Sequence, residues 1–174
     1  MPSLYFGNIS FLNENKNISV DSYCNKNQIN SSQKMVNNIQ STFSKKERKM
    51  MGLDSNEDVD ESILARFVAR SDDEPVSYFE LSDVGKHINA SVGTKNGDKY
   101  RGKGYGSTCI EKGLEWYKKN AYKFKNKPIV WWAEKDNIAS QKIAEKNGFK
   151  KDLSIEQSDD KWIKENWFKY VYKV

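Results

Sequence analysis

The sequence predicts a mixed α/β fold in which helices cover the faces of one sheet. The chain has 174 residues, a length typical of a single domain. Segments with alternating apolar residues, as in strands, are interleaved with segments of helical period. Aromatic residues make up 13% of the chain, which supplies apolar surface for a core without disulfides. We therefore expect one domain over residues 1–174.

The N-terminal 50 residues are expected to hold one strand and one helix. Residues 1–50 are rich in Asn, Ser and Lys, a bias that indicates loops. Within them, SLYFGNISF (3–11) has the pattern of a strand, and SQKMVNNIQSTFSKKERKMM (32–51) that of a helix. The acidic segment Asp54–Glu61 is then expected to be an exposed linker.

Three strands should follow the linker. SILARFVAR (62–70) alternates apolar side chains on two faces, and the turn SDDEP connects it to VSYFELSDV (76–84), which predicts a hairpin. HINASVGT (87–94) is a third short strand. The pair Asn96-Gly97 after it is a strong turn signal.

The second half alternates helices and strands. Ser107–Asn120 has apolar residues on two adjacent stripes, so a helix buried on much of its surface is expected. KPIVWWAE (127–134) is a covered strand, and DNIASQKIAEKNGF (136–149) is a helix that Asp136 or Asn137 caps and Asn147-Gly148 ends. Two closing strands, KKDLSIE and NWFKYVYKV, flank the polar segment QSDDKWIKE. The expected order is β-α-β-β-β-α-β-α-β-β.

Charge is unevenly distributed. Residues 1–100 contain 12 Lys and Arg against 14 Asp and Glu, whereas residues 101–174 contain 17 against 10. An anionic partner, either a nucleic acid or a phosphorylated cofactor, would be drawn to the second half. Because no basic helix is interleaved with aromatic residues, nucleic acid is the weaker of these alternatives.

Cysteine content and apolar runs bear on the compartment. The two cysteines, Cys24 and Cys109, are too few for a disulfide framework. No signal peptide and no membrane-spanning apolar run are recognisable in the sequence. We expect a cytoplasmic protein without a membrane partner, and the sequence leaves its oligomeric state open, a homodimer included.

The segment DKYRGKGYGS sets three glycines and two cations against the start of a helix. Gly97-x4-Gly102-Lys103 imitates a P-loop, but Gly104 stands where that motif needs Ser or Thr. Gly102-x-Gly104-x-Gly106 imitates a dinucleotide fingerprint with its third glycine one residue early. A hairpin whose cations face water is a further alternative. Backbone N–H groups at a helix start favour an anion, and a pyrophosphate is the natural guest.

Two motifs together resemble a known family. Tyr100–Gly106, read YRGKGYG, resembles the acyl-CoA signature (Arg/Gln)-x-x-Gly-x-(Gly/Ala) of the GNAT superfamily of N-acetyltransferases. The helix that opens with Asn137 and ends in Gly148-Phe149 resembles the next conserved unit of that family. The resemblance covers residues 61–174 by motif and residues 1–60 by element order. It implies a mixed, mostly antiparallel central sheet of about six to seven strands flanked by helices.

The resemblance also implies which residues bind acetyl-CoA, the expected cosubstrate, with no metal required. Its pyrophosphate would bind at the glycine loop, its pantetheine arm along the third strand of the hairpin region, and its thiol near the start of the later helix. The residues carried over are Ser91, Val92, Gly93, Arg101, Gly102, Lys103, Gly104, Tyr105, Gly106, Ser107, Asn137 and Ser140. The chain between Val92 and Arg101 is longer than the usual family spacing.

The implied reaction transfers acetyl directly to a primary amine of a small molecule or protein, so no enzyme nucleophile is needed. Glu80 and Glu134 are candidates for the base that deprotonates the amine. Many relatives have a tyrosine acid seven positions after the motif asparagine, where this chain has Ala144. The acid is then another donor, such as Ser140 or a nearby Tyr, or the thiolate leaves without one. This departure resembles the branch with ribosomal-protein N-terminal acetyltransferases and drug- or polyamine-modifying enzymes. A degenerate, non-catalytic binding module is the alternative.

Overall fold

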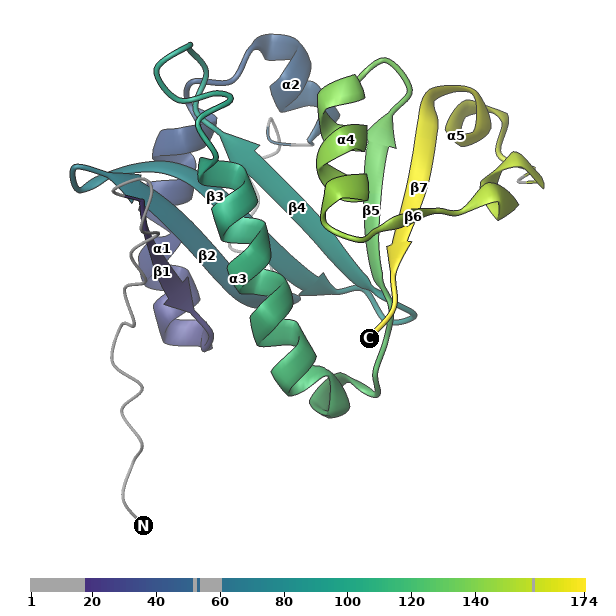
Figure 1. The fold of residues 1–174 in the computed structure, drawn as a ribbon, viewed down its shortest axis with the longest axis horizontal. Coiled ribbons are helices and arrows are strands. Elements are labelled where there is room, and N and C mark those ends of the chain that lie inside the picture. Colours follow the sequence, from purple (N-terminus) through teal and green to yellow (C-terminus); the bar gives the residue numbers. More distant parts are fainter. Residues whose placement is uncertain (1–17, 52, 54–60, 158) are drawn as a thin grey trace.

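A computed structural model describes residues 18–51, 53, 61–157 and 159–174 (Figure 1). Five helices, seven strands and two short 3₁₀ segments lie in this part of the chain. The helices are α1 (Lys26–Gln40), α2 (Lys45–Met50), α3 (Tyr105–Asn120), α4 (Ile138–Lys146) and α5 (Lys161–Asn166). The strands are β1 (Ser19–Tyr23), β2 (Ile63–Ser71), β3 (Glu74–Asp83), β4 (Ile88–Thr94), β5 (Ile129–Glu134), β6 (Lys150–Lys151) and β7 (Trp167–Tyr172). None of the described helices is long and apolar enough to cross a membrane.

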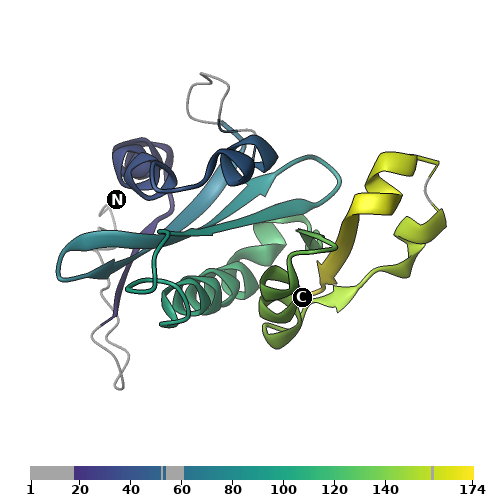
Figure 2. The ribbon, with the colours of Figure 1, turned by 90° about the horizontal axis from the view of Figure 1, so that it is seen from above.

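The strands form one open sheet in the order β1-β2-β3-β4-β5-β7-β6. Every pairing is antiparallel except that of β4 with β5, which is parallel. Helices α1 and α2 cover one face, and α3 and α4 cover the other (Figure 2). This architecture confirms the predicted mixed, mostly antiparallel sheet flanked by helices.

Each face of the sheet has its own core. The larger core lies under α3 and α4 and contains Phe67, Phe79, Trp131 and Phe149. The smaller core lies under α1, where Ile39 and Tyr78 are buried. The two adjacent tryptophans of β5 point to opposite faces, as the strand period requires. Trp131 is buried in the larger core and Trp132 is partly exposed.

The hairpin and the strand after it agree with the sequence prediction. Strands β2 and β3 pair in antiparallel register, from Ile63 opposite Ser82 to Ser71 opposite Glu74. The turn between them places Asp72 and Asp73 at positive φ, a conformation that Asp tolerates better than most residues.

The cysteines are both unpaired, which confirms the expectation that the chain is not built on a disulfide.

The prediction of one helix over 32–51 is wrong. The chain forms α1 from Lys26 and, after a break, a separate α2 from Lys45. Ser44 and Glu47 form a capping box, in which each side chain accepts a hydrogen bond from the backbone N–H of the other residue. The motif Ser-x-x-Glu was visible in the sequence and marks this second helix start.

The remaining differences lie at the two ends of the described chain. The expected strand 3–11 lies outside the described residues, as does most of the acidic linker. Ser19–Tyr23, which the polar bias assigned to a loop, forms β1 because Val20 and Tyr23 contact the two cores. The expected strand 150–156 keeps only its first two residues in β6. The end of the expected polar connection and the first residue of the expected last strand form α5 (Lys161–Asn166), capped by Asp160.

Candidate functional site

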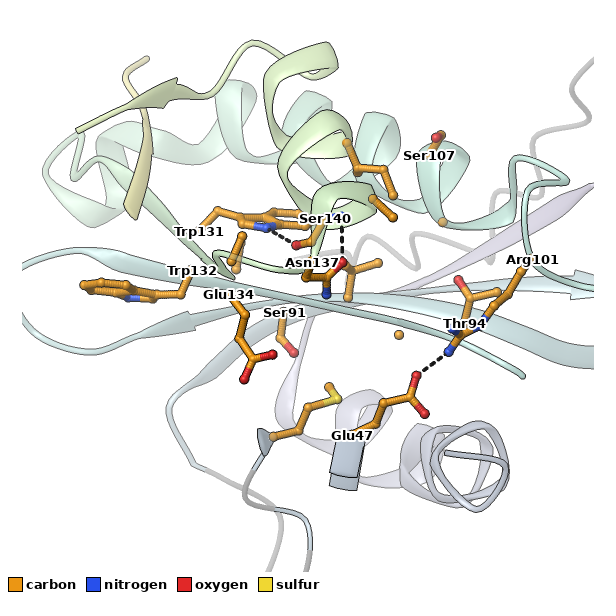
Figure 3. A pocket seen from close by; sticks show the side chains of 18 of the residues that line it. Glu47, Ser91, Thr94, Arg101, Ser107, Trp131, Trp132, Glu134, Asn137 and Ser140 are labelled. Atoms are coloured by element: carbon orange, nitrogen blue, oxygen red, sulfur yellow. Dashed lines mark hydrogen bonds and ion pairs between the residues drawn. The ribbon is translucent and has the colours of Figure 1, made fainter. Parts of the chain in front are cut away.

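The candidate site lies where β4 and β5 separate. Their parallel pairing covers only Ile88–Ile129, Asn89–Val130 and Ala90–Trp131. Beyond Ala90 both strands continue, β4 to Thr94 and β5 to Glu134, without a register partner between them. A cavity of about 790 Å³ opens at this divergence and extends to the start of α3 (Figure 3). The sheet itself therefore creates the site.

The backbone of β4 presents hydrogen-bonding groups to this cavity. Ile88 N donates to Pro128 O at 2.9 Å, so the main chain of Ile88 faces β5. Lys95 N donates to Val76 O at 2.9 Å, so the main chain of Lys95 faces β3. Because the direction alternates along a strand, the N–H and C=O groups of Val92 and Thr94 face the opening. Of the predicted Ser91–Gly93, Val92 therefore has the accessible backbone, while the main chains of Ser91 and Gly93 face β3.

The glycine loop forms an anion nest at the start of α3. Gly102 and Gly104 have φ of 71° and 91°, values in the left-handed region that favours glycine. The first backbone bond of the helix runs from Thr108 N to Gly104 O, so the N–H groups of Tyr105, Gly106 and Ser107 precede it. These three residues line the cavity. The nest and the positive end of the helix dipole therefore open on the same cavity as the free edge of β4.

Arg101 of the glycine loop bridges to α2. Its Nη2 lies 2.6 Å from Glu47 Oε1, and both residues line the cavity (Figure 3). Burial alone would raise the pKa of Glu47, but hydrogen bonds from Arg101, Asn96 and the Ser44 backbone lower it to about 2. The Glu47 carboxylate therefore stays charged at neutral pH and keeps the guanidinium at the rim.

Helix α4 and its capping residue contribute polar groups to another wall of the cavity. Asn137 Oδ1 accepts from Ser140 N at 3.0 Å and caps the helix, which identifies the capping residue among the two candidates. Its side-chain NH₂ is then the group that can donate to a ligand. Ser140 Oγ accepts from Trp131 Nε1 at 2.9 Å, so the serine keeps its own proton for a further hydrogen bond. Both residues line the cavity.

Ala144 occupies a different environment. It is fully buried in the larger core, and its carbonyl accepts from Phe149 N at 3.1 Å at the end of α4. It has no polar side chain, and it is outside the cavity lining. The position of the tyrosine acid of many relatives is therefore a packing position in this chain.

Glu134 lies in the cavity at the end of β5, on the side of the sheet covered by α2 (Figure 3). Burial and the neighbouring Asp136 charge raise the pKa of Glu134, while Lys46 of α2 opposes the rise. Lys46 Nζ lies 3.3 Å from Asp136 Oδ2, so that cation is shared with Asp136. A carboxylate with a raised pKa accepts a proton more readily near neutral pH.

The structure separates the two candidate bases. Glu80 lies outside the cavity lining, and its Oε2 is 2.6 Å from Nη2 of the buried Arg66. Lys103 is exposed and also lies outside the lining. The predicted residues that do line the cavity are Ser91, Val92, Gly93, Arg101, Gly102, Gly104, Tyr105, Gly106, Ser107, Glu134, Asn137 and Ser140.

Several lining residues escaped the sequence analysis. Phe43 lies between α1 and α2, and Glu47 lies in α2, in the segment that the sequence analysis joined into one helix. Trp167 comes from β7, next to β5 in the sheet. For Phe43 and Glu47, the capping box at Ser44 was the signal in the sequence that could have found them. The sequence holds no such signal for Trp167, because strand order decides which residues lie beside Glu134.

The open mixed sheet, with a glycine loop and a helix start beside the divergence of its parallel pair, agrees with the resemblance to acyl-CoA-dependent acyltransferases. A family model described as "Acetyltransferase (GNAT) domain" matches residues 22–150. The chain therefore belongs to the GNAT family of acetyltransferases and is an acyltransferase. No curated protein sequence matches the chain.

Solved structures of low sequence identity share the fold. The ribosomal-protein-S18-alanine N-acetyltransferase of Escherichia coli has 12% identity and a TM-score of 0.58 over 90% of this chain and 94% of its own. The PaiA N-acetyltransferase of Thermoplasma acidophilum, solved with coenzyme A, has 16% identity and a TM-score of 0.56 over 90% and 99%. The spermidine/spermine N-acetyltransferase SpeG of Vibrio cholerae has 13% identity and a TM-score of 0.54 over 88% of this chain and 92% of its own.

Proposed function

We propose that the protein transfers acetyl from acetyl-CoA directly to a primary amine of a small molecule or protein. One observation carries the proposal: the anion nest at the start of α3 and the free edge of β4 open on one cavity. A pyrophosphate fits the first feature and an amide-containing arm fits the second. Acetyl-CoA carries both groups in one molecule and is the cosubstrate that the family resemblance implies.

The cosubstrate is assigned to the cavity group by group. Its pyrophosphate binds the N–H groups of Tyr105, Gly106 and Ser107. Its pantetheine amides pair with the main chain of Val92 and Thr94, as an added strand would. The thioester then reaches the divergence of β4 and β5, with Ser140 on the opposite wall.

Acetyl transfer requires a neutral amine. A lysine-type amine with a pKa of about 10.4 is almost fully protonated at pH 7, so its ammonium must first lose a proton, for which Glu134 is the acceptor. The nitrogen lone pair then forms the C–N bond and the C–S bond breaks, with its electron pair going to sulfur. The second proton leaves the nitrogen for solvent. Ser140 can donate its proton to the departing thiolate and take one back from solvent. The N-substituted acetamide and the CoA thiol are the products.

Thermal unfolding with acetyl-CoA tests the proposal. A ligand of the native state at 100 times its Kd stabilises the protein by about 2.7 kcal/mol, a rise in Tm of roughly 5–10 °C for a chain of this length. Ser107→Glu places a negative charge in the first turn of α3, which favours the helix but repels a pyrophosphate. We expect this variant to fold normally and to lose the shift.

Ser31→Glu is the matched control, since it adds the same charge at an exposed position of α1 outside the cavity. This variant should retain the full shift. Absence of a shift in the unmodified protein at millimolar acetyl-CoA would refute the proposal. Binding of acetyl-CoA without CoA release on any amine of a broad panel would favour the degenerate binding module.

A further inference from the structure

One carboxylate holds both ends of the connection 95–100 between β4 and the glycine loop. Lys95 begins this connection, and its Nζ donates to Glu74 Oε1 at 2.7 Å. Tyr100 ends it, and its hydroxyl donates to the same carboxylate, 3.3 Å from Oε1 and 3.2 Å from Oε2. Glu74 begins β3 and lies outside the cavity lining, whereas Tyr100 belongs to the lining. A carboxylate outside the cavity is therefore bonded to a residue of its wall.

The position of Tyr100 is fixed by more than its hydroxyl. Lys95 is only 5% exposed, so its buried charge requires the Glu74 carboxylate beside it. The Nζ atoms of Lys95 and Lys99 lie 5.7 and 5.2 Å from the centre of the Tyr100 ring, within the range of cation–π contacts. The backbone N–H of Tyr100 donates to Gly97 O at 3.0 Å. The ring, the hydroxyl and the main chain of Tyr100 are thus all bound within the protein.

The glycine loop needs such a fixed starting point. It begins directly after Tyr100, and its Gly102 and Gly104 have positive φ. Glycine loses more conformational freedom on ordering than any other residue, so a mobile glycine loop would bind an anion at an entropic cost. Helix α3 fixes the far end of the loop, where Thr108 N donates to Gly104 O. The contact between Tyr100 and Glu74 is the corresponding constraint at the start of the loop.

We propose that Glu74 is a positioning residue for the cosubstrate, acting through the Tyr100 hydroxyl to hold the glycine loop in the conformation that binds the pyrophosphate. The inference rests on the proposed function. It gives a role to the long chain between Val92 and Arg101, because both ends of the connection meet at this carboxylate. Glu74 touches neither substrate, so losing it should weaken the binding of acetyl-CoA and leave the chemical step unchanged.

Tyr100→Phe tests the inference most directly. It keeps the ring on the cavity wall and leaves the ion pair of Lys95 with Glu74 intact, so only the hydroxyl link is removed. We expect the Kd for acetyl-CoA, measured by isothermal titration calorimetry, to rise about 5-fold, the effect of roughly one hydrogen bond. With the most active amine of a panel, KM for acetyl-CoA should rise by the same factor, while kcat and KM for the amine stay unchanged.

Asp83→Ala is the matched control for Glu74→Ala. Asp83 ends the strand that Glu74 begins, lies outside the cavity lining, and is 2.8 Å from Lys127 Nζ. Each substitution removes the carboxylate partner of a lysine at one end of β3. Both should lower the Tm, but only Glu74→Ala should raise the Kd for acetyl-CoA. An equal rise in both variants would show that general destabilisation is the cause and would overturn the inference.

The double variant Tyr100→Phe/Glu74→Ala tests whether the two residues act through one contact. If they do, its Kd for acetyl-CoA should be no higher than that of Glu74→Ala alone. Additive losses, or a Kd in Tyr100→Phe equal to that of the unmodified protein, would overturn the inference while acetyl transfer stands. Failure of the unmodified protein to bind acetyl-CoA would instead refute the proposed function, and this inference with it.

Discussion

Glu134 is the residue whose protonation state should govern the rate. It lines the cavity, and burial together with the Asp136 charge raises its pKa above the ordinary value for glutamate. A base acts in its deprotonated form, so activity should rise as the pH increases through this raised pKa. If the residue acted as an acid, activity would instead fall as the pH increases through this pKa.

Glu134→Gln tests this role. We expect kcat to fall about 100-fold, because a positioned base contributes at least this factor. The acidic limb of the pH–rate profile should vanish, leaving only the titration of the amine. The thermal shift with acetyl-CoA should be retained, since the carboxylate is assigned to the acceptor and not to the cosubstrate.

Asp136→Asn provides the comparison. Its charge raises the pKa of Glu134, so its removal should move the acidic limb to lower pH without abolishing activity. An unchanged limb in Glu134→Gln would assign the base to another group. Unlike Glu134, Glu80 is paired with Arg66 outside the cavity, which leaves it no direct path to the amine.

At the scale of elements, β4 has two different edges. Its pairing with β3 extends to Thr94, whereas its pairing with β5 ends at Ala90. The N–H groups of Val92 and Thr94 consequently face the cavity, and those of Ser91 and Gly93 face β3. The amide hydrogens of Val92 and Thr94 should therefore exchange with solvent more readily than those of Ser91 and Gly93.

Hydrogen exchange by NMR checks this assignment. In the free protein the Val92 and Thr94 amides should exchange faster than those of Ser91 and Gly93. Saturating acetyl-CoA should slow Val92 and Thr94 selectively, because the pantetheine arm replaces the missing strand. Equal protection of all four amides with and without ligand would contradict the placement of the arm.

The elements that could be predicted from the sequence are mostly those set by residues close together in the chain. The glycine loop, the start of α4 at Asn137 and its end at Gly148 are set by neighbouring residues, and their positions were predicted. The break before α2 was equally local, since Ser44 and Glu47 are three residues apart, but the apolar period across it suggested one continuous helix. Strand β1 was missed because tertiary packing, not its polar composition, stabilises it.

The parts of the site that could not be predicted involve long-range contacts. Arg101 and Glu47 are 54 positions apart, and their bridge depends on where α2 packs. Trp167 and Glu134 adjoin because β7 pairs with β5, an arrangement that the order of elements leaves open. The glycine loop could therefore be predicted from the sequence, whereas the fold was needed to show which distant residues line the cavity with it.

For the whole molecule, we expect a single cooperative unfolding transition. The two cores lie on opposite faces of the same sheet, and β2 and β3 contribute to both. Loss of either core would expose one face of shared strands, so the two should unfold together. Tryptophan fluorescence and far-UV circular dichroism should give coincident melting curves. Separate midpoints for the two signals would show that the halves unfold independently.

The short contact between β4 and β5 has a mechanical consequence. Three residue pairs connect the four strands of one half of the sheet to the three strands of the other. A cosubstrate arm lying along β4 would strengthen the connection between the two halves of the sheet. In each turnover the sheet would then alternate between a stiffer state with cosubstrate bound and a more flexible state without it.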